Sequence, residues 1–184
     1  GLGDVYKRQE WESLAIASKP KLKGELFVGV KYGHDGQHVA MSVASKTNEG
    51  KIFVEALDCR TIREGNDWIL SYIAEMKPKT VVVDGANGQH ILEKDMKDAK
   101  MKAPTLPTVK EIIGANATFE QGLFKGNICH SNQASLTQSV SNSEKRAIGS
   151  NGGFGYRSLK EGVEIALLDS VILCLLYTSD AADE

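Results

Sequence analysis

The chain has 184 residues, a formal net charge of −2 and 41% hydrophobic residues, which is enough apolar material for one domain with its own core. The near-neutral charge gives no global reason to expect binding to nucleic acid or to an anionic membrane, so a nucleic-acid surface has to come from local patches. No run approaches the roughly 18 apolar residues of a membrane span.

The two ends of the chain resemble adapter sequence rather than folded protein. Residues 1–9 (GLGDVYKRQ) and 174–184 (CLLYTSDAADE) are similar to the in-frame translation of the adapters used to build sequencing libraries, and such segments carry no information about the fold. We therefore expect the biological segment to be 10–173, cut at both ends by a fragment boundary. Cys59 and Cys129 then remain as isolated thiols without metal-ligand spacing, which favours a reduced, cytoplasmic setting.

The first half of the chain predicts a linker followed by hairpins. Residues 10–25 are polar and lysine-rich, with Pro20 and Gly24, and are expected to be a linker from an upstream domain. The folded domain is expected to cover 26–173. Three strands joined by short glycine turns predict an antiparallel meander over 25–33, 36–47 and 50–59.

The second half predicts alternating helices and strands. A helix is expected over 63–76, and it leads to TVVVDG at 80–85, a continuous apolar strand of the buried, parallel kind. Further expected elements are a helix at 88–101, a short edge strand at 103–107, a helix at 108–126 with Ile112, Ile113, Phe119, Leu123 and Phe124 facing inward, a strand fragment at 127–130, a helix at 132–145, a glycine-rich loop or loose hairpin at 147–158, and a helix at 159–173.

This order of elements resembles that of a ribonuclease H-like domain. Such an α/β domain has a mixed sheet, in which three antiparallel strands are followed by parallel strands, and helices flank the sheet. Because element order alone is a weak indicator of topology, the acidic residues have to support the interpretation.

Asp169 stands on an apolar helix face. Its neighbours three and four positions away are Ile165, Ala166, Ile172 and Leu173, so the carboxylate projects from a stripe that should face the core. A buried carboxylate needs compensation by a cation, by hydrogen-bond donors or by a metal ion. A core ion pair with Arg146, Arg157 or a lysine is therefore the alternative to a metal site.

Asp84 ends the buried strand, and the carboxyl ends of parallel strands are where open α/β sheets place their sites. The alternative is that Asp84 is a turn residue or the N-cap of the following helix. Together, Asp84 and Asp169 suit phosphodiester hydrolysis with Mg²⁺ or Mn²⁺, because these ions prefer oxygen ligands and two of them, about 4 Å apart, can activate water and stabilise the leaving oxygen.

Several ordered blocks then resemble one family. The segments FVGVKYGHDG, VVVDGANGQHILEKDM, EIIGANATFEQGLFKGNICH, LTQSVSN and EGVEIALLDSVIL are similar to the C-terminal nuclease domain of the large terminase subunit of tailed bacteriophages, over nearly all of 26–173. The resemblance implies a metal-dependent endonuclease that cuts concatemeric double-stranded DNA during genome packaging. It also implies three acidic metal ligands, the second at the end of the fourth strand, where Asp84 lies, and the third on the last helix, where Asp169 lies.

The sequence departs from the family pattern at the first acid. The pattern has an aspartate on the first strand where this chain has Lys31, and a protonated lysine cannot ligate a metal ion. Asp35, in the following turn, is the nearest replacement, with His34 as a weaker candidate; a turn-forming role is the alternative for Asp35. Without Asp35 the site has two acids and holds one ion or none, and Lys31 can occupy the space as a fixed cation.

Basic residues bracket the glycine-rich segment before the last helix. Lys145, Arg146, Arg157 and Lys160 are expected to hold the phosphate backbone of DNA without sequence choice, and a solvated mobile loop is the alternative.

The resemblance also implies partners and a location. They are an upstream ATPase domain, the portal and the small terminase subunit, in the cytoplasm of the infected bacterial host, with no membrane association. Two other functions stay open: a nuclease-silent DNA clamp or docking module of the packaging motor, and another ribonuclease H-like nuclease such as a junction resolvase.

Overall fold

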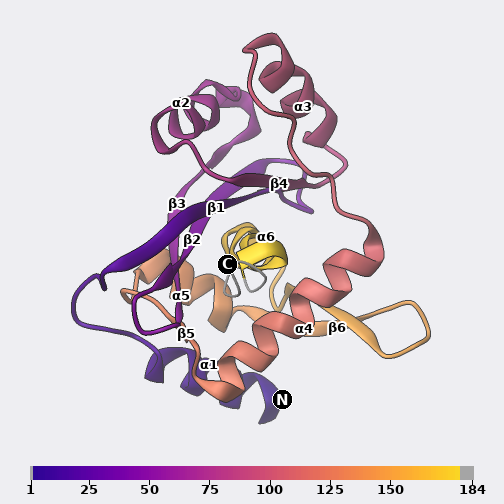
Figure 1. The fold of residues 1–184 in the computed structure, drawn as a ribbon. Helices are drawn as coiled ribbons and strands as arrows, with labels where there is room; N and C mark the ends of the chain where they lie inside the picture. The colour runs from indigo at the N-terminus through magenta and orange to yellow at the C-terminus, as the bar shows by residue number, and fades with distance from the viewer. Residues whose placement is uncertain (1, 179–184) are drawn as a thin grey trace.

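A five-stranded mixed sheet forms the centre of the computed structural model, which describes residues 2–178 (Figure 1). The strands lie in the order β4-β1-β2-β3-β5; β1, β2 and β3 pair antiparallel, β4 is parallel to β1, and β5 is parallel to β3. Their bounds are Leu22–Tyr32 for β1, His38–Thr47 for β2, Ile52–Thr61 for β3, Thr80–Asp84 for β4 and Ile128–Cys129 for β5. The predicted ribonuclease H-like mixed sheet is confirmed.

Beyond β4, the predicted edge strand at 103–107 is reduced to one bridge. Thr105 pairs in parallel with Val82, and its backbone hydrogen bonds reach Val81 and Val83. The proline-flanked segment therefore extends the sheet by a single residue.

Helices cover both faces of the sheet (Figure 1). The side chains of Val28, Val30 and Tyr32 on β1 belong to a core with α2 and α3, whereas Ala40 and Ala44 on β2 belong to a second core with α4, α5 and α6. The alternation of side chains along each strand produces these two cores. The helices are α2 (Asp67–Met76), α3 (Gln89–Asp98), α4 (Val109–Lys125), α5 (Ala134–Ser141) and α6 (Ala166–Thr178), with a 3₁₀ turn at Ile62–Glu64.

The chain ends differ from the sequence-based expectations. The expected linker 10–25 contains the end of helix α1 (Leu2–Ser13) and the start of β1, and Trp11 is completely buried. At the other end, α6 continues to Thr178 with Cys174 and Leu175 in the core. The assignment of 1–9 and 174–184 to adapter sequence stays a prediction, and 179–184 lie outside the described residues.

Two further expectations are corrected. Residues 143–145 were predicted to be helical, but Ser143–Ile148 is strand β6, which pairs antiparallel with β7 (Gly153–Ser158). The glycine-rich segment 147–158 thus contains the end of β6, the turn and β7, which agrees with the hairpin alternative. Phe124, predicted to face inward, is 60% exposed, whereas Phe119 and Leu123 are buried.

None of the helices between residues 2 and 178 has the length and apolar character needed to cross a membrane.

Candidate metal and phosphate site

Lys31 and Asp84 are partners on the neighbouring parallel strands β1 and β4. Register partners point to the same face of a sheet, and two-residue periodicity places Lys31 on the face of Gly29, against which α6 packs. The Nζ atom of Lys31 lies 2.5 Å from Oδ2 of Asp84, and Lys31 is only 7% exposed. Asp84, the last residue of β4, therefore forms a largely buried ion pair with Lys31.

Asp84 is not the N-cap of the next helix. α3 begins at Gln89, and its N-cap is Gly88, which has no side chain to accept a hydrogen bond. Between them, Gly85 has a φ of 114°, and a Cβ atom there would lie 2.3 Å from the carbonyl oxygen of Tyr32. A glycine is required here by both the positive φ and the close approach, and the turn leaves the carboxylate of Asp84 facing Lys31.

Asp169 lies in the first turn of α6 and is brought to the same place by helix packing. A Cβ atom on Gly29 would lie 2.1 Å from the carbonyl oxygen of Ser170, so the helix rests directly on the backbone of β1. A hydrogen bond of 2.6 Å between the hydroxyls of Ser42 and Ser170 ties the helix to β2. Asp169, which precedes Ser170, is thereby held near Lys31 and Asp84, at the carboxyl ends of β1 and β4.

The carboxylate of Asp169 is poorly compensated. Its Oδ2 atom is buried and has no hydrogen-bond partner. Burial raises the pKa of Asp169 from 3.8 to about 7, the positive charge of Lys31 opposes this shift, and the negative charges of Glu164 and Asp84 add to it. Arg157 pairs with Glu144 instead, and within residues 2–178 no cation lies at ion-pair distance from Asp169.

One pocket of about 150 Å³ joins these groups. Its lining includes the charged residues Lys31, Asp84, Arg146 and Asp169 together with His34, and its other lining residues, from α4 and the β6–β7 hairpin, are Val109, Ile112, Asn116, Ile148, Gly155 and Tyr156. Burial, and then the positive charges of Lys31 and Arg146, lowers the pKa of His34, so this ring is neutral at pH 7. Two acids separated by 85 positions in the sequence therefore share a small cavity with Lys31 and Arg146.

Asp35 is held by its own turn and does not line this pocket. Its carboxylate accepts hydrogen bonds from the backbone N–H groups of Gln37 and His38, and lies 2.6 Å from Nδ1 of His38. Partial burial on its own would raise the pKa of Asp35, but the hydrogen bonds from His38 and Gln37 outweigh it and lower the pKa. The local geometry matches the turn-forming alternative.

Glu164 is an acid that sequence reasoning missed. Its carboxylate accepts hydrogen bonds from the backbone N–H groups of Asp35, at 3.4 Å, and Ile165, at 2.9 Å. Burial, and then the charge of Asp35, raises the pKa of Glu164. Its position just before the last helix was the only sequence signal, and a helix start commonly carries an acid for capping alone.

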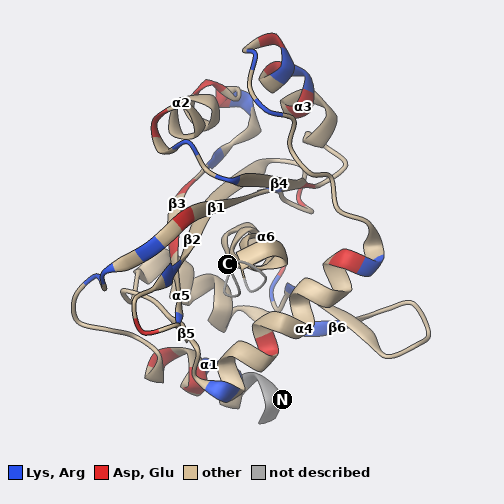
Figure 2. Cartoon of the chain, viewed as in Figure 1, with Lys and Arg blue, Asp and Glu red and all other residues tan. Residues whose placement is uncertain are grey.

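Of the four basic residues predicted to hold DNA, only Arg146 lines the pocket. Lys145 forms an ion pair with Glu120 and lies over the ring of Phe154, and Arg157 pairs with Glu144 at 2.8 Å. Lys160 follows β7, where its carbonyl oxygen accepts a hydrogen bond from Ser158. In Figure 2, basic residues lie on β6 as well as on other elements such as α3, where they alternate with acids.

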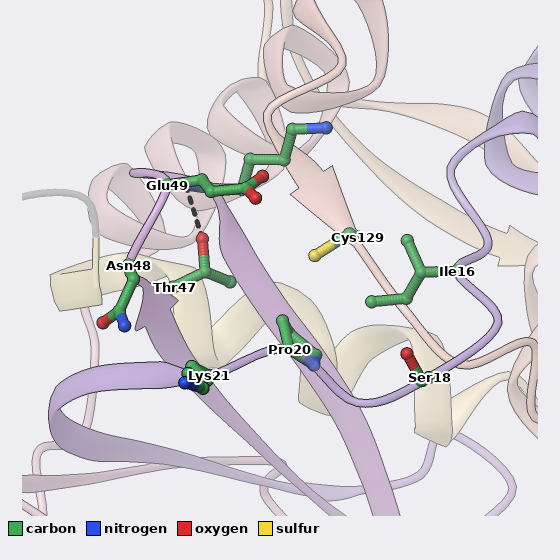
Figure 3. Close-up of a pocket in the computed structure, with 9 residues that line it drawn as sticks. Ile16, Ser18, Pro20, Lys21, Thr47, Asn48, Glu49 and Cys129 are labelled. Atoms are coloured by element: carbon green, nitrogen blue, oxygen red, sulfur yellow. Dashed lines mark hydrogen bonds between the residues drawn. The ribbon is translucent and has the colours of Figure 1, made fainter.

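A larger pocket, of about 360 Å³, lies at the opposite end of β1 (Figure 3). Its walls include the segment 16–21, the β2–β3 turn and Cys129 of β5. Glu49 is the one carboxylate in its lining, so this pocket lacks the paired acids of the first.

Comparison with known proteins identifies the fold. No protein-family model and no curated protein matches the sequence. Among solved structures, the large terminase of bacteriophage HK97 is similar over 92% of this chain, with a TM-score of 0.70 and 15% identity, and this chain spans 42% of that protein.

Isolated nuclease domains match over nearly their whole length. The nuclease domain of the large terminase subunit gp2 of bacterial virus Sf6 has a TM-score of 0.62 and 16% identity, with 92% of this chain and 96% of that chain covered. The large terminase nuclease of the thermophilic phage G20c with bound magnesium has a TM-score of 0.60 and 13% identity, with 89% and 93% covered. The resemblance predicted from the sequence is thus confirmed at the level of architecture: this chain has the ribonuclease H-like fold of the nuclease domains of phage large terminase subunits.

Proposed function

We propose that this chain is the metal-dependent endonuclease domain of a phage terminase large subunit, which cuts concatemeric double-stranded DNA during genome packaging. The observation that carries the proposal is the convergence of Asp84 and Asp169 in one pocket, beside Arg146. A Mg²⁺- or Mn²⁺-dependent reaction is supported by solved nuclease domains of this fold that carry magnesium or manganese.

The residues of the pocket fit a divalent ion. The unpartnered Oδ2 of Asp169 and the carboxylate of Asp84 are oxygen ligands of the kind that Mg²⁺ and Mn²⁺ prefer. Within the described part of the chain no cluster of three or more His, Cys, Asp or Glu side chains is arranged to hold an ion. Since Mg²⁺ is commonly held by one or two carboxylates together with substrate phosphates, this donor set suits one ion rather than two.

The other residues of the pocket act on the DNA backbone. When bound, the ion supplies Lewis-acid polarisation of the phosphodiester and an acidified water. Arg146 presents a guanidinium that can pair with phosphate oxygens in a bidentate manner. Lys145, Arg157 and Lys160 would add further contacts to the phosphate backbone, although Lys145 and Arg157 also form ion pairs with Glu120 and Glu144.

The partners of the domain follow from the same proposal. We place it downstream of an ATPase domain, in contact with double-stranded DNA, the portal and the small terminase subunit, in the cytoplasm of the infected bacterial host.

A plasmid-nicking assay with the full 184-residue chain tests the proposal. We expect nicking that requires Mg²⁺ or Mn²⁺ and falls to background in Asp84→Asn and in Asp169→Asn. Asp98→Asn is the matched control, because Asp98 lies on α3 and pairs with Lys94 on the surface. Nicking that survives both pocket substitutions would contradict the proposal.

The Lys31–Asp84 ion pair favours one second candidate, a nuclease-silent DNA clamp. For this candidate we expect duplex binding without cutting, unchanged by Asp84→Asn and Asp169→Asn. A junction resolvase, the third possibility, would cut branched DNA in preference to linear duplex in the same assay.

A further inference from the structure

The acidic groups of the pocket already have basic groups beside them. Asp84 and Asp169 supply two acidic side chains, and Lys31 and Arg146 supply two basic ones, so the pocket has no excess of acidic groups. A divalent ion entering this cavity would therefore add two uncompensated positive charges. Like charges a few ångströms apart in a partly buried site repel one another strongly.

Lys31 stands where it competes most directly with such an ion. Its Nζ atom is 2.5 Å from Oδ2 of Asp84, one of the oxygens that a metal ion would use. The side chain rises from β1, between β4 and β2 in the sheet, and is 7% exposed, so it cannot swing freely into solvent. The ammonium group of Lys31 is therefore held inside the pocket, beside Asp84.

A DNA phosphate would change this balance. It brings a negative charge into a pocket that already contains Arg146, and it offers Lys31 a second anionic partner. Once the ammonium group shares its charge with the phosphate, Asp84 is released to ligate an ion, and the phosphate itself supplies a further oxygen ligand.

We propose that Lys31 is a built-in counter-ion of the Asp84–Asp169 pair, which keeps the affinity for divalent metal low until a DNA phosphate arrives. The proposal rests on the proposed nuclease function and adds its regulation: metal and DNA bind together, each strengthening the other, as linkage requires. Lys31 acts here as a positioning residue and not as a metal ligand.

Binding of Mn²⁺, followed by the electron paramagnetic resonance signal of the free ion, tests the proposal without measuring cleavage. For the wild-type chain we expect weak Mn²⁺ binding that tightens by about tenfold or more when a phosphorothioate duplex is present. For Lys31→Met we expect Mn²⁺ affinity without DNA to rise by a similar factor, and the effect of DNA to shrink. Lys23→Met is the matched control, because Lys23 is an exposed lysine at the other end of β1.

Two measurements keep the test decisive if Lys31→Met folds poorly. In Lys31→Asp a carboxylate replaces the cation, so Mn²⁺ should raise the unfolding temperature of this variant more than that of the wild type at the same concentration. The wild-type comparison with and without DNA needs no variant. The proposal is overturned if DNA leaves wild-type Mn²⁺ affinity unchanged, or if neither Lys31 variant gains Mn²⁺ binding or stabilisation over the wild type.

The outcomes also separate this inference from the proposed function. If Asp84→Asn loses Mn²⁺ binding while Lys31→Met binds like the wild type, the counter-ion role fails and the nuclease proposal stands. If Mn²⁺ binds the wild type and Asp84→Asn equally, the ion does not use this pocket and the proposed function fails.

Discussion

At the residue scale, the structure concentrates an electrostatic cost on Asp169. Its Oδ2 atom is buried without a partner, and burial is the main cause that raises its pKa to about 7. Soluble domains seldom retain such a group unless it is compensated by a ligand or used in chemistry. A metal ion would compensate it, which links this cost to the proposed activity.

The pKa of Asp169 predicts a pH-dependent stability in metal-free buffer. Because the folded-state pKa lies above 3.8, the folded chain binds more protons than the unfolded chain between these values, so this group's stabilising contribution is present below pH 4 and is lost as the pH rises to about 7. The amide that replaces the carboxylate in Asp169→Asn does not titrate. We therefore expect the advantage of Asp169→Asn over the wild type in free energy of unfolding to grow with pH, by up to about 4 kcal/mol.

Urea denaturation at pH 5 and at pH 8, with a chelator present, measures this difference. An advantage of Asp169→Asn that is the same at both pH values would show that the carboxylate is not desolvated in the folded chain.

At the element scale, the contact between α6 and β1 positions Asp169. Gly29 lets the helix rest on the strand, and the Ser42–Ser170 hydrogen bond sets its position over β2. Lys31 and Asp84 lie on the same face of the sheet through strand pairing alone. The position of Asp169 relative to Lys31 and Asp84 therefore depends on the distance between α6 and β1.

Gly29→Ala should disturb that distance. The new methyl group would lie 2.1 Å from the carbonyl oxygen of Ser170, a backbone atom that cannot rotate away. We expect a loss of about 1–3 kcal/mol in the free energy of unfolding, together with weaker Mn²⁺ binding in the presence of DNA. The matched control is Gly114→Ala in α4, where a Cβ atom meets nothing within 4 Å; alanine should be neutral or stabilising there, by about 0.5–1 kcal/mol. Equal stability of the two variants, measured by urea denaturation, would contradict the tight contact.

At the scale of the whole molecule, one core joins the two ends of the chain. Trp11 of α1 and Cys174 and Leu175 of α6 belong to the same cluster of buried side chains, on the face of the sheet that carries the site. Trp11 also stacks on the ring of His130, with 3.8 Å between ring centroids. The C-terminal part of α6 therefore packs into the core of the folded chain.

This arrangement predicts the effect of truncation. A chain that ends at Leu173 loses two side chains that are each 1% exposed, Cys174 and Leu175, and should lose about 2–4 kcal/mol in the free energy of unfolding. The control is a chain that ends at Thr178, because this chain keeps all of helix α6. Identical unfolding midpoints of the two truncated chains would show that the core ends at Leu173.

Local patterns in the sequence determined much of this protein. Two-residue alternation and short glycine turns predicted the meander, the apolar TVVVDG run predicted β4, and helical spacing predicted that Asp169 would face inward among Ile165, Ala166 and Ile172. The resemblance to terminase nucleases followed from the order of these blocks. Each of these signals is contained within a few neighbouring residues, because backbone geometry repeats every two or every 3.6 residues.

Only the tertiary structure decided how the acids are partnered. Lys31 and Asp84 are 53 positions apart and Asp35 and Glu164 are 129 apart, and no local pattern specifies which long-range partner a charged side chain meets. The predicted helix at 132–145 extended into the first strand of the hairpin for a related reason, since that strand, SEKRAI, has Ile148 as its one large apolar side chain and so lacks the alternating pattern of a half-buried strand. Propensity and periodicity act along the chain, whereas ion pairs and the final turn of a helix depend on the distances that packing sets.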